Sequence, residues 1–74
     1  MANSLSRDRL RSDIAGILGE DPTTISDDEN LIDRGLDSIR LLMLTTRWQN
    51  DGFDIGFLDL ADEPTIAAWA ELTR

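Results

Sequence analysis

Residues 35–50 read GLDSIRLLMLTTRWQN, and this stretch decides the fold of the chain. It predicts a helix from about Ser38 to Asn50, because Asp and Ser are favoured at helix starts and Asp51-Gly52 follows as a stop signal. Since a helix turns about 100° per residue, one face of the segment collects large apolar side chains and is assigned to the core. That face carries Leu41, Leu44, Thr45 and Trp48.

A second apolar stripe lies on the opposite face of this helix and consists of Ile39, Leu42 and Met43. A small helix needs only one such stripe to join a bundle. The second stripe is therefore explained either by a sandwiched helix with both faces buried or by an exposed patch for a partner. We favour the exposed patch, because contiguous apolar surface often marks an interaction site.

Upstream of this helix the chain predicts one helix and one long loop. Apolar periodicity indicates a first helix over residues 6–18, with Gly19 just past its end. Its apolar face carries Leu10, Ile14, Ile17 and Leu18. Residues 20–37 hold seven acidic residues and one arginine without a sustained helical period, so we expect a long loop. Four apolar positions argue against disorder there, namely Ile25, Leu31, Ile32 and Leu36.

Downstream, two shorter helices are expected. Residues 53–61 predict a turn and a short helix with Phe57 and Ala61 on one side. Its inward contacts are assigned to Ile55, Leu58 and Leu60. Thr65 caps a last helix that ends near Leu72, with Ile66, Trp69 and Ala70 facing inward. The fold class is therefore all-α, a small four-helix bundle with a long first loop and a short third helix, and residues 1–74 form one domain.

Composition limits the function. Seventy-four residues leave little room for a substrate cleft and a catalytic constellation, so an independent enzyme is not expected. The chain has no cysteine and no histidine, which removes thiolates and the commonest general base. Its net charge of −8 disfavours nucleic acid and anionic membranes. No stretch resembles a membrane span or a signal peptide, and together with the absence of cysteine this predicts a cytoplasmic location. The chain is also expected to be a monomer.

Ser38 is the most informative single residue. It lies where the long loop ends and the helix begins, so its hydroxyl is expected to point to solvent beside N–H groups that lack intrahelical partners. Taken alone, Asp37 and Ser38 before a helix indicate an ordinary helix cap, and only the surrounding residues favour another role for the serine.

The surrounding residues 30–40, NLIDRGLDSIR, resemble the attachment motif of thiolation domains, the phosphopantetheinyl carrier proteins of nonribosomal peptide synthetases and related systems. Pro64-Thr65-Ile66 resembles the start of their last helix. Gly-Leu-Asp-Ser followed by an aliphatic residue and arginine, together with Arg47-Trp48 and Phe57, is most similar to aryl carrier domains of siderophore assembly lines. Peptidyl carriers more often have Gly-Gly, so Leu36 departs from that branch.

This resemblance implies a covalent 4'-phosphopantetheine arm on Ser38, with Asp37 capping the helix and helping a phosphopantetheinyl transferase to recognise the site. An aryl-acid adenylating enzyme would load the arm, and a condensation domain would take the thioester onward, while the carrier itself stays non-catalytic. The partner-binding residues would be Ile39, Arg40, Leu42, Met43, Phe57 and Ala61, with Arg40 in a partner or loop contact.

Two alternatives stay open: a carrier for another cargo, such as an aminoacyl, peptidyl, D-alanyl or fatty acyl group, and an acidic protein-binding module without a prosthetic group. A calcium loop starting at Asp27 is excluded by its own chemistry. Leu31, Ile32 and Ser38 stand where such a loop needs an oxygen ligand, a glycine and a glutamate. No metal site is expected.

Overall fold

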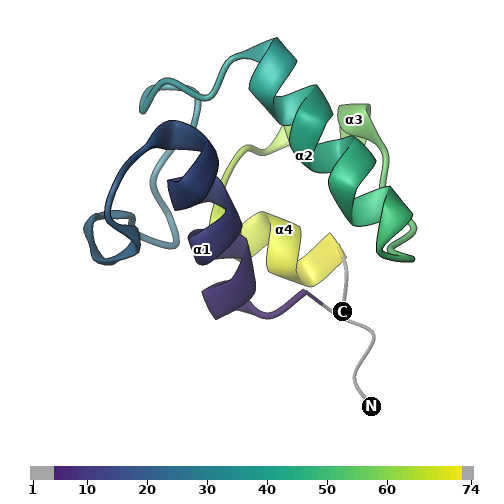
Figure 1. Cartoon of the computed structure of the whole chain (residues 1–74), viewed down its shortest axis with the longest axis horizontal. Helices are drawn as coiled ribbons and strands as arrows, with labels where there is room; N and C mark the ends of the chain where they lie inside the picture. Colours follow the sequence, from purple (N-terminus) through teal and green to yellow (C-terminus); the bar gives the residue numbers. More distant parts are fainter. Residues whose placement is uncertain (1–4, 73–74) are drawn as a thin grey trace.

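The structure is a computed structural model that describes residues 5–72 (Figure 1). These residues form four α-helices and one 3-10 turn, and no strand is present among them. The elements are α1 (Arg7–Leu18), η1 (Pro22–Thr24), α2 (Ser38–Asn50), α3 (Phe57–Asp62) and α4 (Ile66–Leu72). The predicted all-α fold, its long first loop and its short third helix are confirmed.

The ends of the helices follow from local sequence. Ser6 Oγ accepts a hydrogen bond from the Arg9 N–H at 3.1 Å and caps α1, while Gly19 ends the helix in the left-handed region at φ 70°. Thr65 Oγ1 accepts from the Ala68 N–H at 3.1 Å, so the predicted cap of the last helix is also confirmed. The described helices are too short and too polar to cross a bilayer.

Two tryptophans form the centre of the core. Trp48 of α2 and Trp69 of α4 are fully buried and meet edge to face, with ring centroids 5.8 Å apart. The Trp48 indole N–H donates to Asp13 Oδ2 at 2.9 Å, and the Trp69 indole N–H donates to the Leu60 carbonyl at 2.9 Å. The other residues of the predicted core face of α2 are buried as expected, and the Thr45 hydroxyl donates a hydrogen bond to the Leu41 carbonyl.

The expectation that Leu58 faces inward is wrong, because its side chain is 79% exposed. Leu60 is fully buried. Leu58 and Leu60 are two positions apart, which separates their side chains by about 200° around the helix axis, so they cannot both face the core. The short α3 buries Leu60, packs Phe57 partly against the core and turns Leu58 to solvent.

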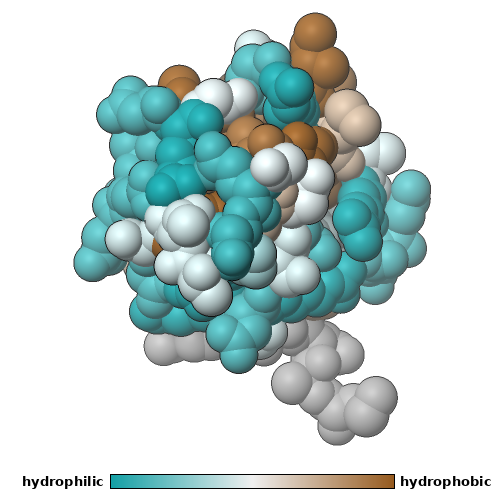
Figure 2. Space-filling model, turned by 60° about the vertical axis from the view of Figure 1, so that its left-hand side comes forward, coloured by the Kyte–Doolittle hydropathy of each residue, from teal (hydrophilic) through white to brown (hydrophobic). Residues whose placement is uncertain are grey.

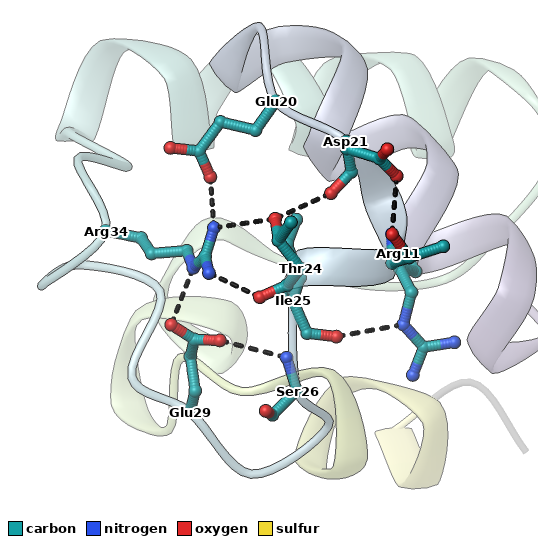
Figure 3. Close-up of polar contacts among 9 residues, drawn as sticks. Arg11, Glu20, Asp21, Thr24, Ile25, Ser26, Glu29 and Arg34 are labelled. Atoms are coloured by element: carbon teal, nitrogen blue, oxygen red, sulfur yellow. Dashed lines mark hydrogen bonds and ion pairs between the residues drawn. The ribbon is translucent and has the colours of Figure 1, made fainter.

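The long loop is ordered by ion pairs and by a few buried side chains. Arg34 extends back across the loop, where its Nε donates to Glu29 Oε2 at 2.6 Å and its Nη1 also pairs with Glu20 (Figure 3). The Leu31 N–H donates to the Pro64 carbonyl at 2.9 Å and ties the loop to the start of α4. Ile25, Leu31 and Leu36 are buried as predicted, whereas Ile32 is 46% exposed and is not an anchor.

The pKa of Glu29 can be measured and reports on the geometry of this loop. The Ser26 N–H and then the Arg34 guanidinium hydrogen-bond the Glu29 carboxylate and lower its pKa below the ordinary value of 4.5. Because the pKa of Glu29 is lower in the folded chain than in the unfolded chain, its ionised carboxylate stabilises the fold at pH values above the unfolded-state pKa. This contribution is lost as the pH falls through the folded-state pKa. We expect NMR titration to give a depressed Glu29 pKa that rises only partly in Arg34→Gln, since the Ser26 bond remains. A Glu29 pKa at or above the ordinary value would contradict the loop geometry.

Candidate cofactor-attachment site at the start of α2

Ser38 is the first residue of α2 and is exposed. Asp37 precedes it as the N-cap, and Asp37 Oδ1 accepts from the Arg40 N–H at 2.9 Å. The capping prediction for Asp37 is therefore confirmed. Because Asp37 caps the helix, the Ser38 hydroxyl is not needed for capping, and this hydroxyl has no hydrogen-bond partner within residues 5–72.

Arg40 pairs with the capping residue itself, because its Nη1 lies 3.0 Å from Asp37 Oδ2. The contact fits the expected loop-contact role, but the partner was not identified from the sequence. The spacing of three residues is the signal that could have found it, since side chains at i and i+3 of a helix meet. Both side chains are about half exposed, so the pair adds little stability. Its effect is local, because it compensates the Asp37 charge beside Ser38.

The segment before Ser38 is held by a compact turn. Asn30 Oδ1 accepts from the Ile32 N–H at 2.9 Å, and the Leu36 N–H donates to the Leu31 carbonyl at 3.1 Å. Gly35 lies at φ 109°, which a side chain would strain. With Leu31 and Leu36 both buried, the turn fixes the point at which α2 begins.

An apolar hollow of about 330 Å³ lies beside Ser38 and is lined by Ser38, Ile39, Leu42 and Phe57. Ile39 is 73% and Leu42 54% exposed, so the stripe on α2 is an open surface and the sandwiched-helix alternative is wrong. The hydrophobic surface that Figure 2 shows near its top lies at the height where α2 begins in Figure 1. Phe57, one of the expected partner-binding residues, lines this hollow but is also half buried against the core.

The structure does not bring all the predicted partner residues together. Met43 is exposed and joins Ile39 and Leu42 in lining a hollow along α2, as the predicted stripe requires. Met43 and Ile39 also line a hollow on the α1 side of α2, together with Ile17 and Arg40. Ala61 is exposed on α3 and does not line the hollow beside Ser38. The predicted stripe of α2 is therefore continuous from the hollow beside Ser38 to Met43, with Arg40 on its α1 side. Ala61 lies apart from it, on α3.

The site fits a phosphodiester on the Ser38 oxygen. The first N–H groups of a helix lack intrahelical partners and carry the positive end of the helix dipole, which favours a nearby anion by about 0.3–1 kcal/mol. The nearest carboxylate, Asp37, is compensated by Arg40, so it opposes an added negative charge less. The hollow beside Ser38 offers apolar surface to the organic part of an attached group.

A small helical domain that presents an unengaged serine at a helix start has the architecture of a carrier domain. The family described as "Phosphopantetheine attachment site" (PP-binding) matches residues 8–73. The chain belongs to this family of domains, which carry 4'-phosphopantetheine covalently.

Curated relatives match the chain over most of its length. It is 41% identical over 70 residues to an isochorismatase of Bacillus subtilis, covering 95% of the chain and 22% of the relative. It is 44% identical over 63 residues to phenyloxazoline synthase MbtB of Mycolicibacterium paratuberculosis, covering 85% of the chain and 5% of the relative. It is 46% identical over 67 residues to enterobactin synthase component B of Escherichia coli, covering 90% of the chain and 23% of the relative. The chain thus spans less than a quarter of each of these relatives.

Proposed function

We propose that the chain is an aryl carrier domain, which holds an aryl acid as a thioester on a 4'-phosphopantetheine arm attached to Ser38. The observation that carries this proposal is the exposed Ser38 hydroxyl, which follows a capping Asp37 in a chain of the phosphopantetheine attachment family. The aryl cargo is supported by the resemblance of residues 35–40 to aryl carriers. Two relatives are named as synthases of phenyloxazoline and of enterobactin, which fits a role in siderophore-type nonribosomal peptide synthesis.

The chain's own contribution is to present, not to catalyse. In the transferase reaction, Ser38 Oγ would form a bond to the phosphorus of the arm, while the pyrophosphate bond of coenzyme A breaks and 3',5'-ADP leaves. The transferase would supply the base that takes the Ser38 proton. The bound arm supplies a terminal thiol, on which an acyl group is carried as a thioester. The chain contains no histidine or cysteine, so the adenylating enzyme and the condensation domain would bring the groups that make and break bonds.

The partner face in this proposal has the hollow of Ile39, Leu42 and Phe57 at its centre. Arg40 and Met43 would form its margin toward α1, and Ala61 its margin along α3. A surface of this kind, apolar at the centre and polar at the rim, suits the small and reversible contacts that successive partners require.

The cargo is tested by loading. The wild-type chain is converted with coenzyme A, magnesium and a broad-specificity transferase, then offered hydroxybenzoic acids, amino acids, D-alanine or fatty acids with the matching adenylating enzymes. We expect intact mass to show efficient loading only with an aryl acid. Preferred loading of another acid would refute the aryl cargo while the carrier role stands. If coenzyme A and the transferase do not add the mass of a phosphopantetheinyl group in the first step, the carrier role itself is refuted.

A further inference from the structure

The arginines near Ser38 differ in how many of their donors the fold uses. Arg34 is the nearest arginine before Ser38 in the chain, and all three of its guanidinium nitrogens have acceptors within the loop. In Arg40, by contrast, Nη1 has the acceptor Asp37 Oδ2, whereas Nε and Nη2 have no hydrogen-bond partner within residues 5–72. Arg40 therefore brings a cation with two unused nitrogens to the start of α2.

The Arg40 side chain leads back to the start of the helix. Cα–Cβ bonds in a helix tilt toward its N-terminus, so a long side chain in the first turn covers the residues before it. Since a helix turns about 100° per residue, Asp37 lies between Ser38 and Arg40 around the helix axis. The ion pair with Asp37 at 3.0 Å therefore draws the guanidinium toward Ser38. Their spacing of two residues separates Ser38 and Arg40 less than a helical wheel indicates.

Attachment of the arm changes the charge balance at this point. Asp37 and Arg40 together carry no net charge, and Ser38 is neutral before modification. A phosphodiester on Ser38 Oγ adds one negative charge beside the Asp37 carboxylate. The unused Nε and Nη2 of Arg40 lie on one edge of the guanidinium, and such an edge can donate to two phosphate oxygens at once. Arg40 can thus keep Asp37 and bind the new anion together.

We propose that Arg40 is a positioning residue for the arm: its Nε and Nη2 hold the phosphodiester on Ser38, while Nη1 keeps the Asp37 carboxylate. The proposal rests on the proposed function, because it requires the arm on Ser38. The root of the arm is then held at two points, by the covalent bond to Ser38 and by the guanidinium. The thiol end stays free to move between partners.

A thermodynamic cycle tests this contact. Wild type, Arg40→Gln and the control Arg7→Gln are converted with coenzyme A, magnesium and a broad-specificity transferase, and intact mass verifies the arm on each chain. Urea unfolding at low salt then gives the unfolding equilibrium constant of every apo and holo form. Arg7 is a matched control, because it is also about half exposed and pairs with one aspartate, Asp27, at 2.8 Å. It begins α1, at the opposite end of the molecule from the start of α2 (Figure 1).

We expect the arm to lower the unfolding equilibrium constant of wild type about two- to five-fold more than that of Arg40→Gln, as for an exposed ion pair. High salt should reduce this difference. Arg7→Gln should respond to the arm as wild type does. The phosphorus NMR shift of the holo chain should move in Arg40→Gln and stay in place in Arg7→Gln.

Arg40→Lys should keep part of the effect, because it retains the charge without the planar fork. It takes the place of Arg40→Gln in the cycle if that variant resists the transferase. An equal response to the arm in wild type and Arg40→Gln would overturn the contact and leave the carrier role standing, since the masses show the arm to be present. A wild-type chain that gains no arm would refute the proposed function, and this contact with it.

Discussion

Replacing Trp48 with alanine should leave the domain largely unfolded. The indole is fully buried, packs edge to face on Trp69 at 5.8 Å, and donates to Asp13 Oδ2 at 2.9 Å. Truncating a buried tryptophan costs about 3–5 kcal/mol, which is comparable with the whole stability of a small domain. Circular dichroism should show lost helix at room temperature or a melting temperature lowered by tens of degrees.

Trp48→Phe is the control that separates packing from hydrogen bonding. It keeps an aromatic ring against Trp69 but leaves Asp13, whose side chain is only 11% exposed, without the indole donor. Arg9 and Arg47 still approach the Asp13 carboxylate, so the loss should be clearly smaller than for alanine. A melting curve of Trp48→Ala close to that of wild type would contradict the assignment of this face of α2 to the core.

Replacing Ser38 with alanine should abolish attachment of the arm completely while the fold survives. The cap of α2 is Asp37, whose Oδ1 holds the Arg40 N–H, so loss of the Ser38 hydroxyl should change stability by no more than about 0.5 kcal/mol. Intact mass after incubation with coenzyme A and transferase should stay at the apo value, with an unchanged circular dichroism spectrum.

Ser12→Ala is the matched control for that experiment. Ser12 is an exposed serine on α1, and its replacement should leave modification at the wild-type level. Labelling that persists in Ser38→Ala would refute Ser38 as the attachment residue. Loss of the helical circular dichroism signal in Ser38→Ala would instead show that Ser38 supports the fold.

The sequence predicts α2 well because two independent signals agree there. Capping residues mark its start at Ser38 and Asp51-Gly52 marks its end, while apolar periodicity separates the core face from the exposed face. Both the bounds and the two faces are confirmed by the structure. A helix of 13 residues repeats its pattern often enough for the orientation to be read from the sequence.

The short α3 shows where this reasoning fails. Its six residues make fewer than two turns, so periodicity cannot separate Leu58 from Leu60, and packing against α2 decides which leucine is buried. The ion pairs of Arg34 span up to fourteen residues of loop and depend on the loop path, which no local pattern encodes. The half-buried position of Phe57 likewise depends on how α3 lies against α2.

The central claim is that Ser38 carries the arm, and fragmentation mass spectrometry of the modified wild-type chain tests it most directly. The protein is incubated with coenzyme A, magnesium and a broad-specificity transferase, digested, and sequenced by peptide fragmentation. The account predicts a single phosphopantetheinyl group per chain, located on Ser38. A group located on any other residue, or no addition under conditions that modify a known carrier protein, would contradict it.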